Sequence, residues 1–212
     1  MVRCGVTALL HQAGWTALDQ QLRMAERSGI ATLIPGDAHC PRALNDLGER
    51  VQHALFVQGT TSFLTRPSND LVTVTGSQAA STYGEQVGTE LAGNFANRES
   101  VLTAVGAYGV EAAVHRAALA ANGDTIAALA GGVDRPHPSG NRDLIDWVGD
   151  VSAPASELPL GSVLARHRFL ARPTLAKAYT PSSLPYSMLR PSGGYLDSTE
   201  QPDRHPVRPA AL

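Results

Sequence analysis

The 212-residue sequence lacks most of the features that define well-known classes of proteins. Its two cysteines, Cys4 and Cys40, have neither the spacing of a metal site nor the number needed for a disulfide framework. Because Lys177 is the only lysine, a Walker A motif is excluded, and no GxGxxG motif is present. No segment approaches the roughly 18 apolar residues of a membrane span, and the first residues do not form a signal peptide. We therefore expect a cytoplasmic protein without a membrane segment, bound metal or cofactor.

Acidic residues are absent from one long segment. The net charge of −2 argues against a uniformly basic nucleic-acid binder, yet no acid occurs between Glu157 and Asp197. The cations of this interval are Arg166, Arg168, Arg172, Lys177 and Arg190. Such a segment could attract phosphate groups, or it could be an ordinary solvated surface. Aromatic residues make up only 5% of the chain and offer few platforms for base stacking.

The middle of the chain alternates between strand and helix patterns. Strands are predicted over 70–76, 100–107 and 125–132, each followed by a helix, at 82–96, 110–122 and 141–148. Ser81 is the expected N-cap of the first helix, with Val87, Leu91 and Phe95 on one face. Residues 151–156 suggest a further strand that is weak or at an edge, because Pro154 lacks an amide hydrogen. This alternation predicts an α/β fold with a parallel sheet and right-handed crossovers.

The two ends of the chain differ from this block. Residues 1–30 have the apolar spacing of one or two helices, and short strands are expected in IATLIPGD and HALFVQG. Six of the fourteen prolines lie from Pro181 onward, among Ser, Gly and mixed charges. We therefore predict a helical extension (1–30), one α/β domain (31–180) and a proline-rich, disordered tail (181–212).

Three turns rich in glycine and small residues follow the three predicted strands. They comprise Gly76 to Ser81, Gly106 to Gly109, and the stretch from Gly131-Gly132 to Asn141. Ligands of parallel sheets collect at the carboxyl ends of the strands, where small residues let a phosphate approach backbone N–H groups closely. Each turn alone could be a simple connection. Together they favour a site for an anionic ligand.

Catalytic residues are harder to identify. Glu111 and His115 are four residues apart on one predicted helix, but the second half of an HExxH zinc motif is missing. His115 is more typical of a helix-surface or packing histidine. Ser77 near either side chain could in principle form a hydrolytic site, although no G-x-S-x-G motif is present. The residues therefore give only weak candidates for catalysis.

The motifs, taken in order, resemble a known family. The segments CPRALNDL…ALFVQG, VTVTGSQAASTYG, AVGAYGVEAAVHRAALAANGDTIAALAGGVDRPHPSGNRDL, SELPLG and RHRFLARPTL are similar to the DprA/Smf DNA-processing proteins, over about residues 30–178. The resemblance implies a Rossmann-like fold of the SLOG superfamily. It also implies single-stranded DNA binding, transfer of the strand to a RecA-type recombinase in recombination or natural transformation, a homodimer, and no catalysis.

Matching the family motifs residue by residue implies a DNA-binding site at the three turns and in the basic segment. From the first turn it takes Gly76, Ser77, Gln78, Ser81 and Tyr83, and from the second Gly106, Tyr108 and Gly109. The remaining residues are Gly132, His137, Ser139, Asn141, Arg168 and Arg172.

The chain departs from the family pattern mainly where the family has charge. Gln78 replaces the Arg of a GSR motif, and Pro173-Thr174 replaces the Asn-Arg of an RNR motif. Other departures are Ala104-Val105 for Ser-Gly, Glu111 for Asp, and His137 for Tyr. A neutral Gln donates hydrogen bonds about half as strong as the charge-assisted bonds of Arg, so we expect weak binding, on the order of micromolar or weaker. Because the family continues into further strands beyond about residue 178, we expect a sheet that is incomplete at its C-terminal edge.

Two alternatives stay open at this point. The same fold serves nucleotide-binding SLOG proteins, and a pocket with less positive charge could suit a single nucleotide. A truncated, degenerate copy with weak or no DNA binding is the other alternative, since a missing strand leaves an exposed sheet edge.

Overall fold

A seven-stranded sheet forms the centre of the described part of the chain. The computed structural model describes residues 19–41, 54–67, 70–162 and 187–189. The strands lie in the order β1-β2-β6-β5-β4-β3-β7. Their bounds are β1 (Ala31–Leu33), β2 (Leu55–Val57), β3 (Leu71–Gly76), β4 (Val101–Val105), β5 (Thr125–Leu129), β6 (Ala153–Ser156) and β7 (Ser187–Leu189). The helices are α2 (Thr82–Ala96), α3 (Val110–Ala120) and α4 (Arg142–Val151), with short 3-10 turns η2 (Thr61–Thr65) and η4 (Ser139–Asn141).

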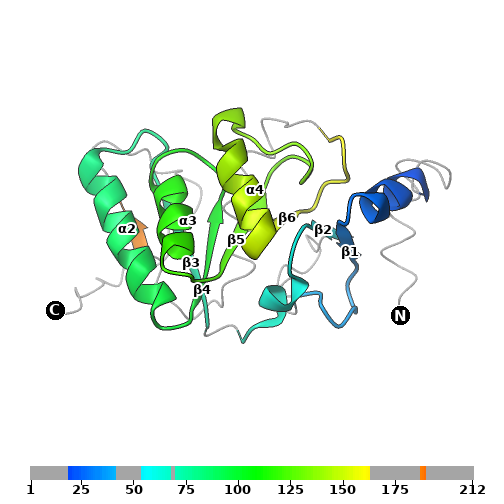
Figure 1. The fold of residues 1–212 in the computed structure, drawn as a ribbon, viewed down its shortest axis with the longest axis horizontal. Helices are drawn as coiled ribbons and strands as arrows, with labels where there is room; N and C mark the ends of the chain where they lie inside the picture. The colour runs from blue at the N-terminus through cyan, green and yellow to red at the C-terminus, as the bar shows by residue number, and fades with distance from the viewer. Residues whose placement is uncertain (1–18, 42–53, 68–69, 163–186, 190–212) are drawn as a thin grey trace, which may run out of the picture.

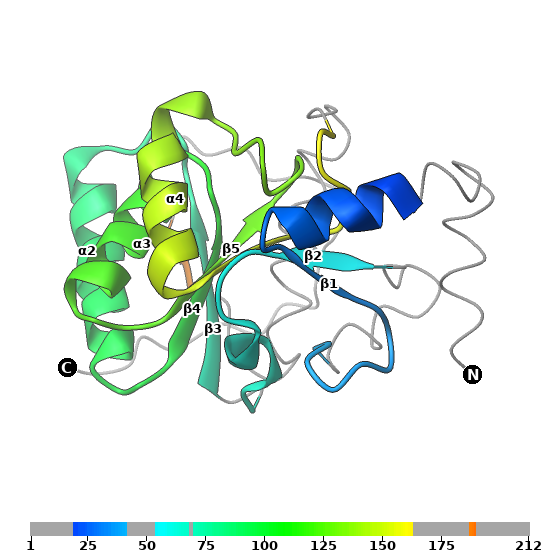
Figure 2. The ribbon, with the colours of Figure 1, turned by 45° about the vertical axis from the view of Figure 1, so that its right-hand side comes forward.

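The alternating block forms the predicted α/β arrangement. Strands β3, β4, β5 and β6 are parallel neighbours, and α2, α3 and α4 connect them in turn. The three helices lie side by side on one face of the sheet, while η2 lies on the other (Figures 1 and 2). In β4, Leu102 and Ala104 pack on the helical side, whereas Val101 and Val105 pack on the opposite side. Burial on both faces explains why these strands are nearly continuous apolar runs.

The other end of the sheet is antiparallel, and here one expectation is wrong. β6 is not an edge strand, because β2 pairs with it antiparallel and β1 continues the sheet beyond β2. The Pro154 carbonyl accepts the amide of Gln58 (3.0 Å) and the Ser152 carbonyl accepts the amide of Thr60 (2.9 Å), so backbone pairing with this segment continues beyond the end of β2 at Val57. Because proline has no amide hydrogen to return the Gln58 bond, the pairing lacks one hydrogen bond at this position.

Helix α2 begins at the predicted residue, but the face that it buries is not the predicted one. The Ser81 hydroxyl accepts a hydrogen bond from the Gly84 amide, which confirms the N-cap. The fully buried face, however, consists of Gly88, Ala92 and Ala96, while Val87, Leu91 and Phe95 are only partly buried. A Cβ on Gly88 would lie 3.1 Å from Val110 Cγ1 of α3. Small residues thus allow α2 and α3 to approach each other closely.

Strand β7 comes from the segment predicted to be disordered. Ser187–Leu189 pairs in parallel with Val74, Thr75 and Gly76, and so it lies along the outer edge of β3. The prediction of a disordered tail therefore fails for these three residues. Elsewhere, residues 19–27 are helical as expected, and Ala25 and Ile30 reach the core. None of the helices in the described ranges is long and apolar enough to cross a membrane.

His115 is a buried packing residue, as its sequence context suggests. Its Nδ1 lies 2.8 Å from the Thr125 hydroxyl, which in turn donates to the Leu102 carbonyl. The side chain is fully buried between α3 and the sheet, and this burial lowers the pKa of His115 from 6.5 to about 4. The imidazole is therefore neutral in the folded protein at neutral pH.

This pKa predicts that the protein loses stability in mild acid. The unfolded chain binds a proton on His115 near pH 6.5, but the folded chain does so only near pH 4. The free energy of unfolding is unaffected above pH 6.5 and falls as the pH drops toward 4, by about 2 kcal/mol at pH 5. Urea midpoints at about pH 7.5 and pH 5 measure the loss. The His115→Gln variant is the control, and an equal loss in both proteins would contradict the assignment.

Candidate nucleic-acid interface

The three glycine-rich turns lie next to one another at one edge of the sheet. They follow β3, β4 and β5, which are adjacent and parallel, so their carboxyl ends point to the same edge. Neighbouring strands are about 4.8 Å apart, so the turns span on the order of 10 Å. We call this surface the three-turn rim: turn 1 is 76–81, turn 2 is 106–109 and turn 3 is 131–141.

Turns 1 and 2 are in direct contact. The Val110 amide at the start of α3 donates to the Ser77 carbonyl (3.2 Å). Gly109 has a φ of +72°, and a Cβ there would overlap the carbonyl oxygens of Ser77 and Gln78. A Cβ on Gly76 would lie 2.7 Å from the Val110 side chain. Glycine is therefore required at both positions for the two turns to meet.

Turns 2 and 3 are joined by Asn141 and Tyr108. The Nδ2 of Asn141 donates to the carbonyls of Gly106 (3.2 Å) and Ala107 (2.9 Å). From the other side, the Tyr108 hydroxyl lies 2.6 Å from where a Cβ of Gly140 would be. Each turn thus supplies one side chain that reaches the other. These contacts hold the three turns in one arrangement.

The structure separates the site residues expected from the sequence into two groups. Gly106, Gly132 and Asn141 are buried and support the turns, while Gly76, Ser77 and Gly109 are partly buried. The exposed group comprises Gln78, Ser81, Tyr83, Tyr108, His137 and Ser139. The side chains of Tyr83 (75% exposed) and Tyr108 (46%) are large and well exposed. Arg168 and Arg172 lie outside the described residues.

The helix that starts at turn 2 has donors available for a ligand. No side chain caps the N-terminus of α3, because its N-cap residue is Gly109. Helix α2, in contrast, is capped by its own Ser81. Within the described part of the chain, no backbone carbonyl accepts from the Tyr108 or Gly109 amide. Amides near an uncapped helix start can donate to an anion.

Beneath the rim lies one buried carboxylate. Glu111, in the first turn of α3, accepts a hydrogen bond from the Thr75 hydroxyl at the end of β3 (2.9 Å). The positive end of the helix dipole stabilises a negative charge at this position. Because Glu111 and His115 are both buried and His115 bonds Thr125, neither is presented to a substrate beside Ser77. The hydrolytic arrangement considered from the sequence is not assembled, and the described residues contain no metal-ligating cluster.

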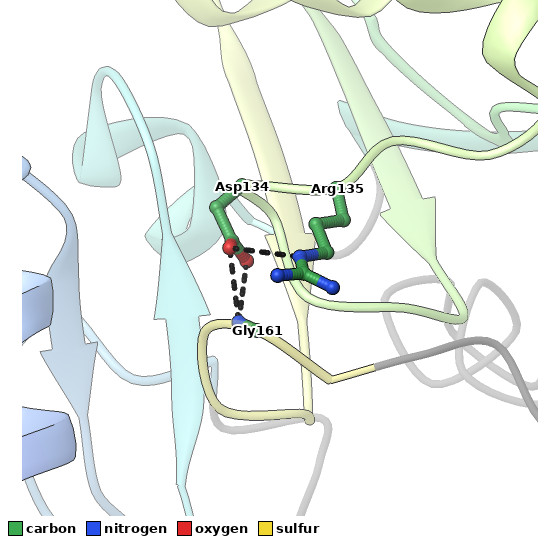
Figure 3. Close-up of polar contacts among 3 residues, drawn as sticks. All are labelled: Asp134, Arg135 and Gly161. Carbon is green, nitrogen blue, oxygen red and sulfur yellow. Dashed lines mark hydrogen bonds and ion pairs between the residues drawn. The ribbon is translucent and has the colours of Figure 1, made fainter.

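A contact that sequence reasoning missed connects turn 3 to the segment after β6. Both carboxylate oxygens of Asp134 accept the Gly161 amide, at 3.0 and 2.9 Å (Figure 3). The Gly132 amide donates to the Ser162 carbonyl (3.3 Å) and strengthens the same connection. Asp134 lies within the segment AGGVDRPHPSGN, which is part of the family resemblance. The Asp134 carboxylate therefore holds the loop after β5 against residues 161–162, which precede the basic segment in the sequence.

Two glycines with similar φ angles allow a test of the contact between turns 1 and 2. Gly109→Ala should lower the free energy of unfolding by several kcal/mol, because backbone strain of about 1–3 kcal/mol adds to the overlap with Ser77. Gly161→Ala is the matched control, with a φ of +76° and no atom within 4 Å of the added Cβ. Urea unfolding of both variants measures the difference. Equal destabilisation would show that the turns do not pack as described.

Comparisons with known proteins identify the family of this chain. The family model of DNA recombination-mediator protein A matches residues 31–196. A Mycobacterium tuberculosis protein named as a DNA processing protein DprA is 44% identical over 105 residues, or 50% of this chain and 27% of that protein. The Streptococcus pneumoniae DprA is 33% identical over 118 residues, which cover 56% of this chain and 40% of the relative. The alignments thus span less than half the length of these relatives.

Solved structures share the fold. The X-ray structure of DprA from Streptococcus pneumoniae superposes with a TM-score of 0.67 and 26% identity, covering 76% of this chain and 55% of that one. DprA from Helicobacter pylori, described for its single-stranded DNA binding mode, gives a TM-score of 0.63 and 25% identity, covering 71% and 66%. These findings confirm the resemblance read from the motifs: the chain belongs to the DNA recombination-mediator protein A family, the DprA/Smf proteins.

Proposed function

We propose that the three-turn rim binds single-stranded DNA. The observation that carries the proposal is the contact among three turns at one sheet edge, together with two exposed tyrosines and helix-start amides that donate to no described backbone carbonyl. Membership of the recombination-mediator family and the likeness to a DNA-binding relative support the same ligand. No catalytic residue is needed for this function.

Two kinds of contact would hold the strand. The amides of Tyr108 and Gly109, with the polar side chains of Gln78 and Ser139, can donate to phosphate oxygens. The exposed rings of Tyr83 and Tyr108 offer flat faces on which bases can stack, independently of base identity. Such a site selects a single strand over a duplex, because the bases of a duplex are already stacked on each other.

We expect this chain to bind single-stranded DNA more weakly than a family member that has the Arg of the GSR motif. At position 78 a neutral amide stands where charge would give a stronger phosphate contact, so we expect dissociation constants on the order of micromolar or weaker. We further propose the role of a recombination mediator, which hands the bound strand to a RecA-type recombinase in the cytoplasm, with a homodimer as the working form.

Fluorescence anisotropy with labelled oligo-dT tests the proposal directly. We expect saturable binding at low salt that weakens as salt increases, and competition by unlabelled single strands but not by duplex of the same length. A mononucleotide as a second competitor separates strand binding from nucleotide binding. No binding at about 50 mM salt and high protein concentration would refute the proposal.

A matched pair of aromatic residues tests the stacking contact. Tyr108 on the rim and Trp147 on α4 have nearly equal exposure, 46% and 45%. Tyr108→Ala should weaken oligo-dT binding by about 1–3 kcal/mol, roughly five- to hundredfold, because a base loses its platform. Trp147→Ala should leave the affinity unchanged. Equal effects of the two substitutions in the same anisotropy assay would remove Tyr108 from the binding surface.

A further inference from the structure

We propose that Arg135 is the phosphate-binding cation of the three-turn rim. This inference rests on the proposed function and names a residue that the family motifs do not assign. The three turns contain no other Arg or Lys. Its side chain is 60% exposed, so the guanidinium can reach a ligand in solvent.

The surroundings of Arg135 hold its backbone and leave its side chain available. Its amide donates to the Gly132 carbonyl (2.9 Å) in a tight turn, and the neighbouring Asp134 is bound to the Gly161 amide. The only described carboxylate near the guanidinium is Asp134, whose Oδ2 is 3.8 Å from Nε, beyond hydrogen-bond distance (Figure 3). Because an exposed pair at this distance is weak, the five N–H donors of the guanidinium remain available for a phosphate.

The hydrogen bonds of Asp134 explain how its negative charge can lie beside a cation that binds phosphate. Both carboxylate oxygens face the Gly161 amide, so the negative charge is directed into the loop contact. The pair thus divides two tasks between adjacent residues. Asp134 positions the turn, and Arg135 projects from it.

Arg135 cannot simply replace a cation at position 78. Turn 1 follows β3 and turn 3 follows β5, and β4 lies between them. Two strand spacings place the turns on the order of 10 Å apart, so residues 78 and 135 would contact different phosphates. A DNA strand that crosses the rim would therefore meet a positively charged side chain only at turn 3. Substitutions at positions 78 and 135 should act independently.

The test is the salt dependence of oligo-dT binding. Arg135→Ala should weaken binding roughly ten- to hundredfold and reduce the slope of log K against log salt by about 0.7, because one phosphate contact is lost. Arg135→Lys should keep the slope, since it keeps the charge. Arg116→Ala, which removes an exposed charge from α3, is the matched control and should change neither quantity. Thermal melting of each variant checks that the fold is intact.

The outcomes separate this inference from the function on which it rests. If the wild-type chain does not bind oligo-dT, the proposed function fails and the inference fails with it. If wild type binds and Arg135→Ala keeps its affinity and slope, only the role of Arg135 is refuted. Weaker binding with an unchanged slope would also overturn it, because that pattern means a structural effect through the Asp134 contact.

A double substitution provides a second, independent measurement. Gln78→Arg should raise the salt slope by about 0.7 through a new contact at turn 1. Combined with Arg135→Ala, it should return the slope to the wild-type value, with additive free-energy changes. A strongly non-additive result would show that both positions bind one phosphate, contrary to the proposed separation.

Discussion

The side-chain amide of Asn141 makes the contact on which the rim depends. By donating to the carbonyls of Gly106 and Ala107, it ties the start of α4 to the end of β4. Those carbonyls are buried, and without Asn141 they would need other donors. Turn 1 joins the same assembly because Gly109 lets Ser77 approach the start of α3. The outer surface can carry exposed polar and aromatic groups only because this inner set is fully engaged.

This arrangement separates support from recognition within the same short stretches of chain. Buried glycines and Asn141 set the backbone, whereas Gln78, Tyr108 and Ser139 face solvent on the same turns. A substitution of the first kind should act through stability, and one of the second kind through the proposed DNA binding. Tyr108 does both to some extent, since its hydroxyl rests against Gly140 while its ring is half exposed. A ring fixed in this way loses less conformational freedom when a base stacks on it.

Much of the fold follows from sequence, while several contacts do not. The strands and helices of the central block have strong periodicity, and parallel strands must end at one edge, so the meeting of the three turns could be expected. The edge position inferred for Pro154 failed because a proline rule is local, whereas the pairing of β6 with β2 depends on a distant segment. The role of Asn141 was equally hidden, since an asparagine in a loop can bind a ligand or hold the backbone. Close packing through Gly88 shows the same limit, because apolar scales favour large residues.

The distribution of charge is what distinguishes this rim from one built on several arginines. With Gln78 neutral and Arg135 the one Arg or Lys in the three turns, stacking and backbone amides must supply a larger share of any binding energy. Stacking depends little on ionic strength, whereas each phosphate contact releases counterions. A strand bound in this way would be weakly held at low salt and would lose comparatively little affinity as salt rises. Under the proposed mediator role, in which the strand is passed to another protein, a modest affinity of this kind would favour transfer of the strand over its retention.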